Sequence, residues 1–276
     1  MGAFGPAAHL HFRASHKLTA AKASEKEGRA MYEEHPIFQK APDEAKLWRY
    51  MDFTKLVSLL EQEALFFCRS DKLGDPFEGS LTKATVAAIE KEFADIPEEQ
   101  LSKLTGGYKE WQRCTVLNCW TMSDHESAAL WVQYLQSPEG VAIQSTFGRL
   151  TESFVAGGDR PVYVGTVHYI DYETDLVPVS NAMYPFLYKR KSFEHEHEVR
   201  AVIFKIPTED GKINWEFEPF ESGGEYVSID IDRLIEAIYV SPTAPGWFKV
   251  LVESVVARYG LDTPVINSSL ADRPVF

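Results

Sequence analysis

The sequence has little cysteine and none of the common enzyme signatures. Its 276 residues include only three cysteines, Cys68, Cys114 and Cys119. Their number is odd and none forms a C-x-x-C pair, so neither a disulfide framework nor a zinc knuckle is indicated. The sequence also lacks the glycine-rich dinucleotide motif, the phosphate-binding Walker loop, the H-E-x-x-H motif and the G-x-S-x-G motif. The usual motif-based assignments of chemistry are therefore excluded.

Long apolar runs and an excess of basic residues are missing as well. No run approaches the roughly 18 apolar residues of a membrane span, and residues 1–30 contain no apolar stretch of signal-peptide length. We therefore expect a cytoplasmic protein with no membrane partner. The net charge of −13 argues against general nucleic-acid binding, because phosphate backbones attract basic surfaces. Lys189–Lys191 is the one candidate basic patch, and its alternative interpretation is a solvated helix end.

The pattern of apolar residues divides the chain near residue 46. Residues 1–45 show little periodicity, so we predict a mobile N-terminal arm there, outside the core. Residues 46–276 are predicted to form a single domain in which strands and helices interleave irregularly. This order favours an α+β fold over a regular βαβ winding. We expect a bent, mixed or antiparallel sheet that is split by helices.

The predicted elements are short. Strands are expected over residues 47–50, 65–68, 115–121, 141–143, 161–170, 198–206 and 265–266, and at the end of 231–240. Helices are expected after a cap at Asp52, in two parts over 81–113 with the second starting at Pro97, from a capping box at Ser123 through Tyr134, and over 180–190 and 246–259.

The acidic stretch from Glu194 to Arg200 is the best candidate for chemistry. Interpreted as a strand, it places the residues with even numbers, Glu194, Glu196, Glu198 and Arg200, on one face and His195 and His197 on the other. Three carboxylates on one face repel one another, a cost that is tolerable in water or beside a cation and otherwise raises a pKa. A glutamate at the mouth of a buried strand is well placed to hold a hydroxyl or to stabilise a developing positive charge. The alternative is a structural ion pair between Glu198 and Arg200.

The two histidines of this stretch support a different hypothesis. An H-x-H pattern on a strand directs both imidazoles to one side, so His195 and His197 are candidate metal ligands for a metal-dependent hydrolase. No third ligand stands at a telling spacing, although His125 and His168 are candidates to approach in space.

Several motifs together resemble a bacterial family. In chain order they are Leu47-Trp48-Arg49-Tyr50, Asp75-Pro76-Phe77-Glu78, Cys119-Trp120-Thr121-Met122-Ser123 with Leu130-Trp131-Val132-Gln133-Tyr134, and Lys189 followed by Phe193–Arg200. The late Ile238-Tyr239-Val240-Ser241-Pro242 and Ser268-Ser269-Leu270 also fit. Over residues 46–270 this pattern is similar to the bacterial domain-of-unknown-function 2971 family. The resemblance implies no established activity.

A second resemblance implies a fold and a function. Mono-ADP-ribosyltransferases of the arginine–serine–glutamate type carry an early arginine, a hydroxyl-rich middle strand and a late E-x-E strand. Here Arg49 with Tyr50, then Thr121 and Ser123, then Glu196 and Glu198 stand in that order. The resemblance implies an ADP-ribosyltransferase-like fold with NAD as substrate and a macromolecular acceptor, in bacterial conflict or phage defence. A guanidinium suits the NAD pyrophosphate.

The glutamates take distinct roles under this resemblance. Glu198 would hold the nicotinamide ribose and stabilise an oxocarbenium-like transition state, and Glu196 would orient or activate the acceptor. The sequence departs from the family pattern at Met122, which stands where a threonine is expected. The competing hypothesis is a non-catalytic module that binds a ligand or a protein. Catalysis requires Glu198 in a cleft within reach of Arg49, whereas a structural role buries it in a satisfied pair.

Overall fold

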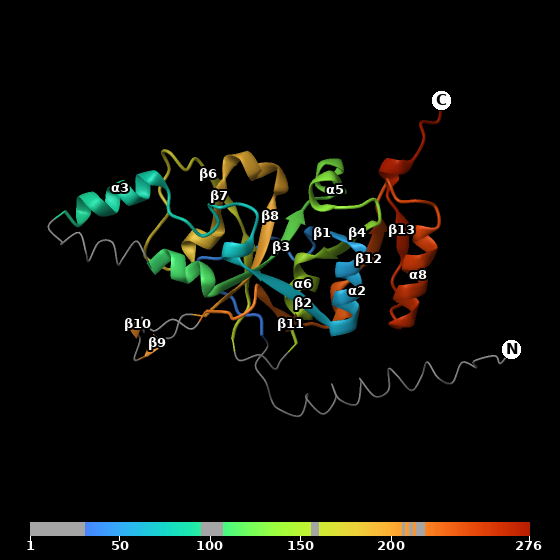
Figure 1. Cartoon of the computed structure of the whole chain (residues 1–276), viewed down its shortest axis with the longest axis horizontal. Coiled ribbons are helices and arrows are strands. Elements are labelled where there is room, and N and C mark those ends of the chain that lie inside the picture. Colours follow the sequence, from blue (N-terminus) through green and yellow to red (C-terminus); the bar gives the residue numbers. More distant parts are fainter. Residues whose placement is uncertain (1–30, 95–106, 156–159, 206–207, 210–211, 214–218) are drawn as a thin grey trace.

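The computed structural model describes residues 31–94, 107–155, 160–205, 208–209, 212–213 and 219–276. It is an α+β fold built on one large mixed sheet (Figure 1). Within the described residues, this sheet has nine strands: β1 (Lys46–Asp52), β2 (Ala64–Arg69), β3 (Thr115–Met122), β4 (Gly140–Thr146), β5 (Tyr163–Thr166), β8 (Glu198–Phe204), β11 (Gly224–Ser228), β12 (Ala237–Val240) and β13 (Val265–Asn267). Two short pairs stand apart from it: β6 (His168–Ile170) with β7 (Tyr188–Arg190), and β9 (Thr208–Glu209) with β10 (Lys212–Ile213).

Helices cover both faces of the sheet. The α-helices with assigned bounds are α2 (Phe53–Gln62), α3 (Lys83–Glu92), α5 (Ala128–Tyr134), α6 (Phe147–Ser153), α7 (Ile231–Leu234) and α8 (Phe248–Arg258). Residues 107–113 are helical as well. The 3₁₀ helices are η1 (Ser70–Lys72), η2 (Tyr184–Leu187), η3 (Lys191–Glu196) and η4 (Ser269–Ala271). In α2, the leucines at 56, 59 and 60 recur on one face and enter the main core, which also receives the buried side of α8. On the other face, Leu130 and Trp131 of α5 pack against Trp48 and Tyr50 of β1.

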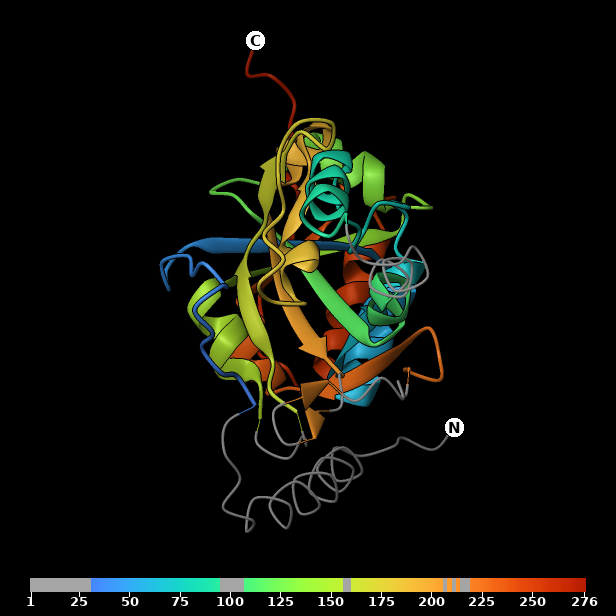
Figure 2. The same ribbon diagram turned by 90° about the vertical axis from the view of Figure 1, so that its left-hand side faces the viewer.

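The sheet divides along one edge of β3. The first half of β3 pairs with β2, through Cys68 opposite Leu117, whereas its end pairs with β1, through Trp48 opposite Thr121. Because β2 and β1 pair with opposite ends of this same edge, they part beside the middle residues of β3. The other edge of β3 is fully paired with β8. In Figure 2, β3 (green) runs beside β8 (orange), and β1 (blue) crosses the pair.

The N-terminal boundary differs from the prediction. Residues 31–45 do not lie outside the core: Met31 and Phe38 are buried, and the backbone N–H of Glu33 donates to the carbonyl of Val162 at 3.0 Å. The predicted arm is therefore too long at its C-terminal end, because these apolar residues have no helical or strand period and still fill gaps beside β5. Residues 1–30 and the predicted helix start at Pro97 lie outside the described residues, and a single domain over 46–276 stays a prediction.

Local hydrogen bonding corrects three further predictions. The helix α5 begins after Ser127, whose hydroxyl accepts from the N–H of Leu130, and not at the predicted capping box of Ser123. Asp52 precedes α2 without capping it, because its carboxylate instead accepts from the N–H of Gln136. Residues 180–190 are not one helix: Pro185 lies in η2, and the chain then extends as β7.

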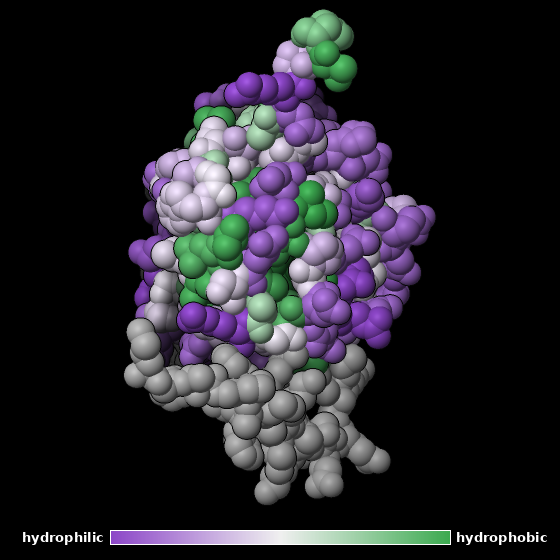
Figure 3. Space-filling model, turned by 90° about the vertical axis from the view of Figure 1, so that its right-hand side faces the viewer, coloured by the Kyte–Doolittle hydropathy of each residue, from purple (hydrophilic) through white to green (hydrophobic). Residues whose placement is uncertain are grey.

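One outer face of the molecule is partly apolar. Figure 3 shows apolar side chains gathered in the middle of the face on the right-hand side of Figure 1, where polar side chains divide them. On that side lie α8 and β13, with exposed Val250, Leu251 and Ile266, and Trp247 is exposed directly before α8. No helix in the described part of the chain is long and apolar enough to cross a membrane.

Candidate functional site

A cavity of about 450 Å³ lies where β1 and β2 part. Three strands contribute to it: β1 over residues 48–51, β2 over 64–68 and β3 over 117–121. The helix α2 adds Lys55 and Ser58, and Tyr134 of α5, Glu196 of η3 and Glu198 of β8 complete the lining. The cavity is of ordinary size for a small-molecule site and has the mixture of apolar walls and a few polar groups that such sites show.

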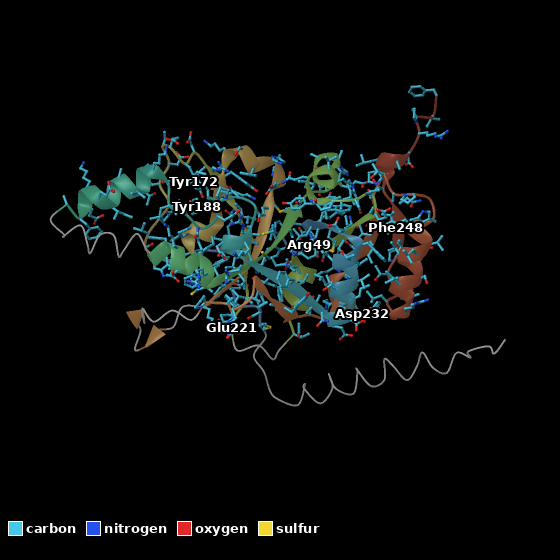
Figure 4. All side chains as sticks on the ribbon, in the orientation of Figure 1. Arg49, Tyr172, Tyr188, Glu221, Asp232 and Phe248 are labelled. Carbon is cyan, nitrogen blue, oxygen red and sulfur yellow. The ribbon has the colours of Figure 1, made fainter. Side chains whose placement is uncertain are left out.

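In the described part of the chain, Arg49 is one of two cations that line this cavity, beside Lys55. Its Nη1 donates to the carbonyl oxygen of Cys119 at 2.5 Å, and its guanidinium lies 5.9 Å from the ring centroid of Trp120. No carboxylate among the described residues forms an ion pair with it, and burial lowers the pKa of Arg49 from its usual range. Figure 4 labels Arg49 near the centre of the molecule. A desolvated guanidinium with donors to spare is suited to an anionic ligand group.

Glu196 and Glu198, which line the cavity, belong to a buried cluster of charges. It joins Glu78, Lys189, Glu196, Glu198 and Arg200, all buried. The Nε of Arg200 donates to Glu198 Oε1 at 2.8 Å, and its Nη2 donates to Glu78 Oε1 at 2.7 Å. The Nζ of Lys189 donates to Glu196 at 2.5 Å and to Glu198 at 2.9 Å. Three carboxylates thus face two cations, so the cluster has one acid more than base.

A strand start and a glycine turn position two of these carboxylates. Glu198 begins β8, where it faces Thr121 across the ladder to β3. Glu78 precedes Gly79, whose φ of 67° brings the backbone against Phe186. A Cβ at Gly79 would lie 2.4 Å from that ring, so only glycine fits there. Phe186 in turn offers its carbonyl oxygen to Arg200.

The cluster keeps Glu198 ionised. Burial alone would raise the pKa of Glu198, but the charges of Arg200 and Lys189 outweigh it and lower the pKa to about 2. Burial would likewise lower the pKa of Lys189, and the nearby Glu198 carboxylate instead raises it. The Cys119 thiol beside Glu198 has a pKa well above its usual range, through burial and then through that carboxylate. Glu198 is therefore a fixed negative charge and not a proton acceptor at neutral pH.

The predicted acidic strand is wrong in its first half. Residues from Lys191 to Glu196 form η3, and His197 follows with a φ of 41°, in the left-handed region. The strand starts only at Glu198, so the alternation expected for Glu194–Arg200 does not hold. Glu194 is exposed, whereas Glu196 turns inward and accepts from Gln133 Nε2 at 2.7 Å.

The predicted basic patch is also corrected. Lys189 is buried among carboxylates, and Arg190 donates to Asp75 at 2.8 Å. Only Lys191 of this triplet is exposed. The three residues therefore do not present a joint basic surface, because two of them neutralise acids of the protein itself.

Most of the predicted site residues line one cavity, although they come from segments far apart in the sequence. Those that line it are Arg49, Tyr50, Thr121, Glu196 and Glu198. Ser123 does not: its carbonyl accepts from Trp48 Nε1 and its hydroxyl from the N–H of His125. The hydroxyl of Tyr50 accepts from the N–H of Ser127, and burial raises the pKa of Tyr50 to about 12. Tyr50 thus serves as packing and as an anchor of α5.

The described residues supply no further ligands for a metal site at His195 and His197. No group of three or more histidine, cysteine, aspartate or glutamate side chains suited to a metal ion occurs among them. The Nε2 of His195 lies 3.2 Å from the amide oxygen of Gln133, and His197 is exposed after the turn.

Sequence reasoning missed Lys189 and Glu78 as parts of the site. Both stand in the motifs that carried the first resemblance, but the pattern gave no sign that they meet Arg200 in space. Arg200 itself was expected only as the partner of Glu198. The contact between Glu78 and Arg200 joins residues 122 positions apart, and such a separation leaves no local signal.

Comparison with known proteins gives little. No family model and no curated protein matches the chain, so the resemblance to the domain-of-unknown-function 2971 family stays a prediction. A solved structure, DarT of Thermus sp. 2.9 in complex with NAD+, matches with a TM-score of 0.38 and 8% sequence identity, covering 85% of this chain and 100% of that chain. At that TM-score, function must be inferred from the residues of this chain.

Proposed function

We propose that the chain binds NAD in the cavity between β1 and β2 and transfers its ADP-ribosyl group to a macromolecular acceptor. One observation carries this proposal: the same cavity holds Arg49, which has no carboxylate partner among the described residues, and Glu198, a carboxylate fixed by two cations.

The charges of the two walls suit a ligand with two unlike ends. Arg49 offers a positive charge, Lys55 adds a cation whose ammonium lies 3.8 Å from Asp52, and the cluster around Glu198 has one acid in excess. NAD combines a diphosphate with a cationic nicotinamide ring. Its diphosphate would bind Arg49, and its nicotinamide riboside would bind near Glu196 and Glu198. An opposite charge at each end favours this orientation over its reverse.

The proposed reaction makes modest demands on the protein. The bond from ribose C1′ to the nicotinamide nitrogen breaks, and its electron pair leaves with neutral nicotinamide. The positive charge that develops on the ribose lies beside the Glu198 carboxylate, whose pKa of about 2 keeps it charged. An acceptor oxygen, nitrogen or sulfur then bonds to C1′ and releases its proton to solvent. A fixed carboxylate in a low-dielectric site stabilises such a transition state without reorganising.

The burial and full hydrogen bonding of Glu198 favour a second candidate function, in which the protein binds the nucleotide without turning it over. Glu198 is only 5% exposed, and both of its carboxylate oxygens already accept hydrogen bonds from Arg200 or Lys189. In that case the cavity recognises the nucleotide and Glu198 serves the fold. The acceptor and a role in bacterial conflict or phage defence are expectations from the sequence resemblance.

The test measures NAD binding by calorimetry and nicotinamide release by chromatography for the full chain. Glu198→Gln removes the charge at the reacting centre, and Glu194→Gln is its matched control, an exposed glutamate of the same motif. Transfer predicts that Glu198→Gln loses at least about a hundredfold in release, roughly 2.7 kcal/mol of transition-state stabilisation. Glu194→Gln should stay within twofold of the wild type.

The outcomes separate the two candidates. Binding of NAD without nicotinamide release by any variant supports recognition without turnover. Absence of both binding and release excludes both candidates. Because Glu198→Gln also disturbs a buried ion pair, its unfolding curve in urea is measured alongside, and release is compared only where the variant is folded.

A further inference from the structure

Two exposed aromatic side chains stand at the cavity. Phe66 of β2 is 40% exposed and Tyr226 of β11 is 50% exposed. They lie directly opposite each other in the ladder between the two strands, with ring centroids 5.1 Å apart. Both line the cavity that contains Arg49. The neighbouring residues on β2, Leu65 and Phe67, are buried, so on this strand the exposed apolar surface at the cavity comes from Phe66.

The rings are held in place by their surroundings. The hydroxyl of Tyr226 shares a 2.8 Å hydrogen bond with Ser58 Oγ of α2. Under Phe66, a Cβ at Gly224 would lie 2.6 Å from the Cζ of the phenyl ring, so the ring packs where glycine has no side chain. An aromatic pair fixed in this way and open to solvent is suited to stacking against a flat ring.

We propose that Phe66 and Tyr226 bind the purine ring of a nucleotide whose diphosphate lies at Arg49. This assignment rests on the proposed function, and it names the end of the ligand that each wall takes. Ser58 and Lys55 are three positions apart on α2 and so share a helix face. The aromatic pair therefore lies on the side of the cavity that carries Lys55. A cationic nicotinamide ring would be repelled there by Arg49 and, more weakly, by Lys55, whose ammonium lies 3.8 Å from the carboxylate of Asp52. A neutral purine would not be repelled.

The experiment compares four probes on the full chain by calorimetry: NAD, ADP, nicotinamide mononucleotide and inorganic pyrophosphate. Phe66→Leu and Tyr226→Leu remove one ring each. Tyr226→Phe keeps the ring and loses only the hydrogen bond to Ser58. Trp247→Leu, at the residue before α8, is the control, since Trp247 is similarly exposed and does not line the cavity.

The purine assignment predicts a selective effect. Removing either ring should weaken NAD and ADP about tenfold, the size of one base-stacking contact. Nicotinamide mononucleotide and pyrophosphate should change by less than twofold, and Trp247→Leu should behave as wild type. Tyr226→Phe should weaken ADP by less than Tyr226→Leu does, because it keeps the ring and loses only the anchor at Ser58. ADP binding that depends on both rings supports the assignment even if no nicotinamide is ever released, so it can survive the failure of the transfer proposal.

Three results overturn the assignment. Equal weakening of nicotinamide mononucleotide and ADP would place the nicotinamide ring at Phe66 and reverse the ligand. Unchanged ADP affinity in both leucine variants would leave the rings without a ligand role, even if NAD is still turned over. A wild-type chain that binds none of the four probes contradicts the purine subsite and the proposed function together.

Discussion

Replacement of Arg49 by methionine should separate binding from stability. Methionine keeps an unbranched stem that packs against Trp120, and it removes the charge and the donors of the guanidinium. Most buried arginines pair with a carboxylate, so their loss leaves an uncompensated acid behind. Arg49 contacts the backbone carbonyl of Cys119, and no carboxylate among the described residues pairs with it.

The expected magnitudes follow from that difference. A hydrogen bond to a charged group contributes about 1.5–3 kcal/mol, which Arg49→Met loses at Cys119. Against it stands the cost of desolvating an ion that has no carboxylate partner, which is several kcal/mol for a buried ion and less for the half-buried Arg49. We expect the free energy of unfolding to stay unchanged or to rise by about 1 kcal/mol. Binding of NAD or ADP should weaken about 10- to 150-fold, because the ligand loses a charge-assisted contact of the same 1.5–3 kcal/mol.

The assay pairs urea unfolding with calorimetric titration of ADP. Arg69→Met is the matched control, because Arg69 on the adjacent strand binds Asp71 at 2.6 Å and the carbonyl of Phe220 at 2.8 Å, and does not line the cavity. The control should lose stability and keep its affinity. If Arg49→Met unfolds more easily by over 2 kcal/mol and still binds ADP as wild type does, the guanidinium is structural and the reasoning fails.

Three further perturbations address the charge cluster and its turn. The folded-state pKa of Glu198, about 2, is below the usual value of about 4.3, so the stabilisation from its ionised form should be complete above about pH 5 and fade toward pH 2. Urea unfolding measured over this pH range should show a smaller loss of stability in Glu198→Gln than in the wild type. Equal losses in the two proteins would contradict the low pKa. Glu78→Gln should cost about 3 kcal/mol in denaturant unfolding, since it leaves Arg200 short of a partner; a change below 0.5 kcal/mol, about that of a surface substitution, would argue against the pair. His197→Gly should raise the free energy of unfolding by about 1 kcal/mol in thermal scans, because glycine adopts the observed φ of 41° without strain; a loss of stability would mean that the imidazole matters more than the backbone.

The sequence predicted the strands that form the site better than the site itself. Alternating or apolar runs located β1, β3 and β8 within a few residues, since burial on a pleated sheet imposes that pattern on each strand separately. The cavity, however, exists because β1 and β2 share one edge of β3, and a pairing between distant segments has no local signature. The interruption at His197 was missed for a related reason, because no glycine marks that left-handed turn.

The sequence indicated several residues of the candidate site, but it did not indicate which of their charges are paired. An arginine, a threonine and two glutamates were chosen for their order in the sequence, and Arg49, Thr121, Glu196 and Glu198 all line one cavity. Which of these charges would be free depended on partners elsewhere. Lys189 and Arg200 neutralise Glu198, whereas the corresponding position beside Arg49 is occupied by a carbonyl. Only tertiary structure decides that difference.

The five-membered cluster also bears on how this protein can evolve. Removing one partner of a buried pair costs about 3–5 kcal/mol, a large part of the 5–15 kcal/mol that holds a typical domain together. Glu78, Lys189, Glu196, Glu198 and Arg200 are therefore expected to be inherited as a unit across the loop, the short β7 strand, η3 and β8 that supply them. Lineages that abandon the cluster should replace its acids and bases in the same step or by way of a neutral, well-packed intermediate, so that these positions vary together.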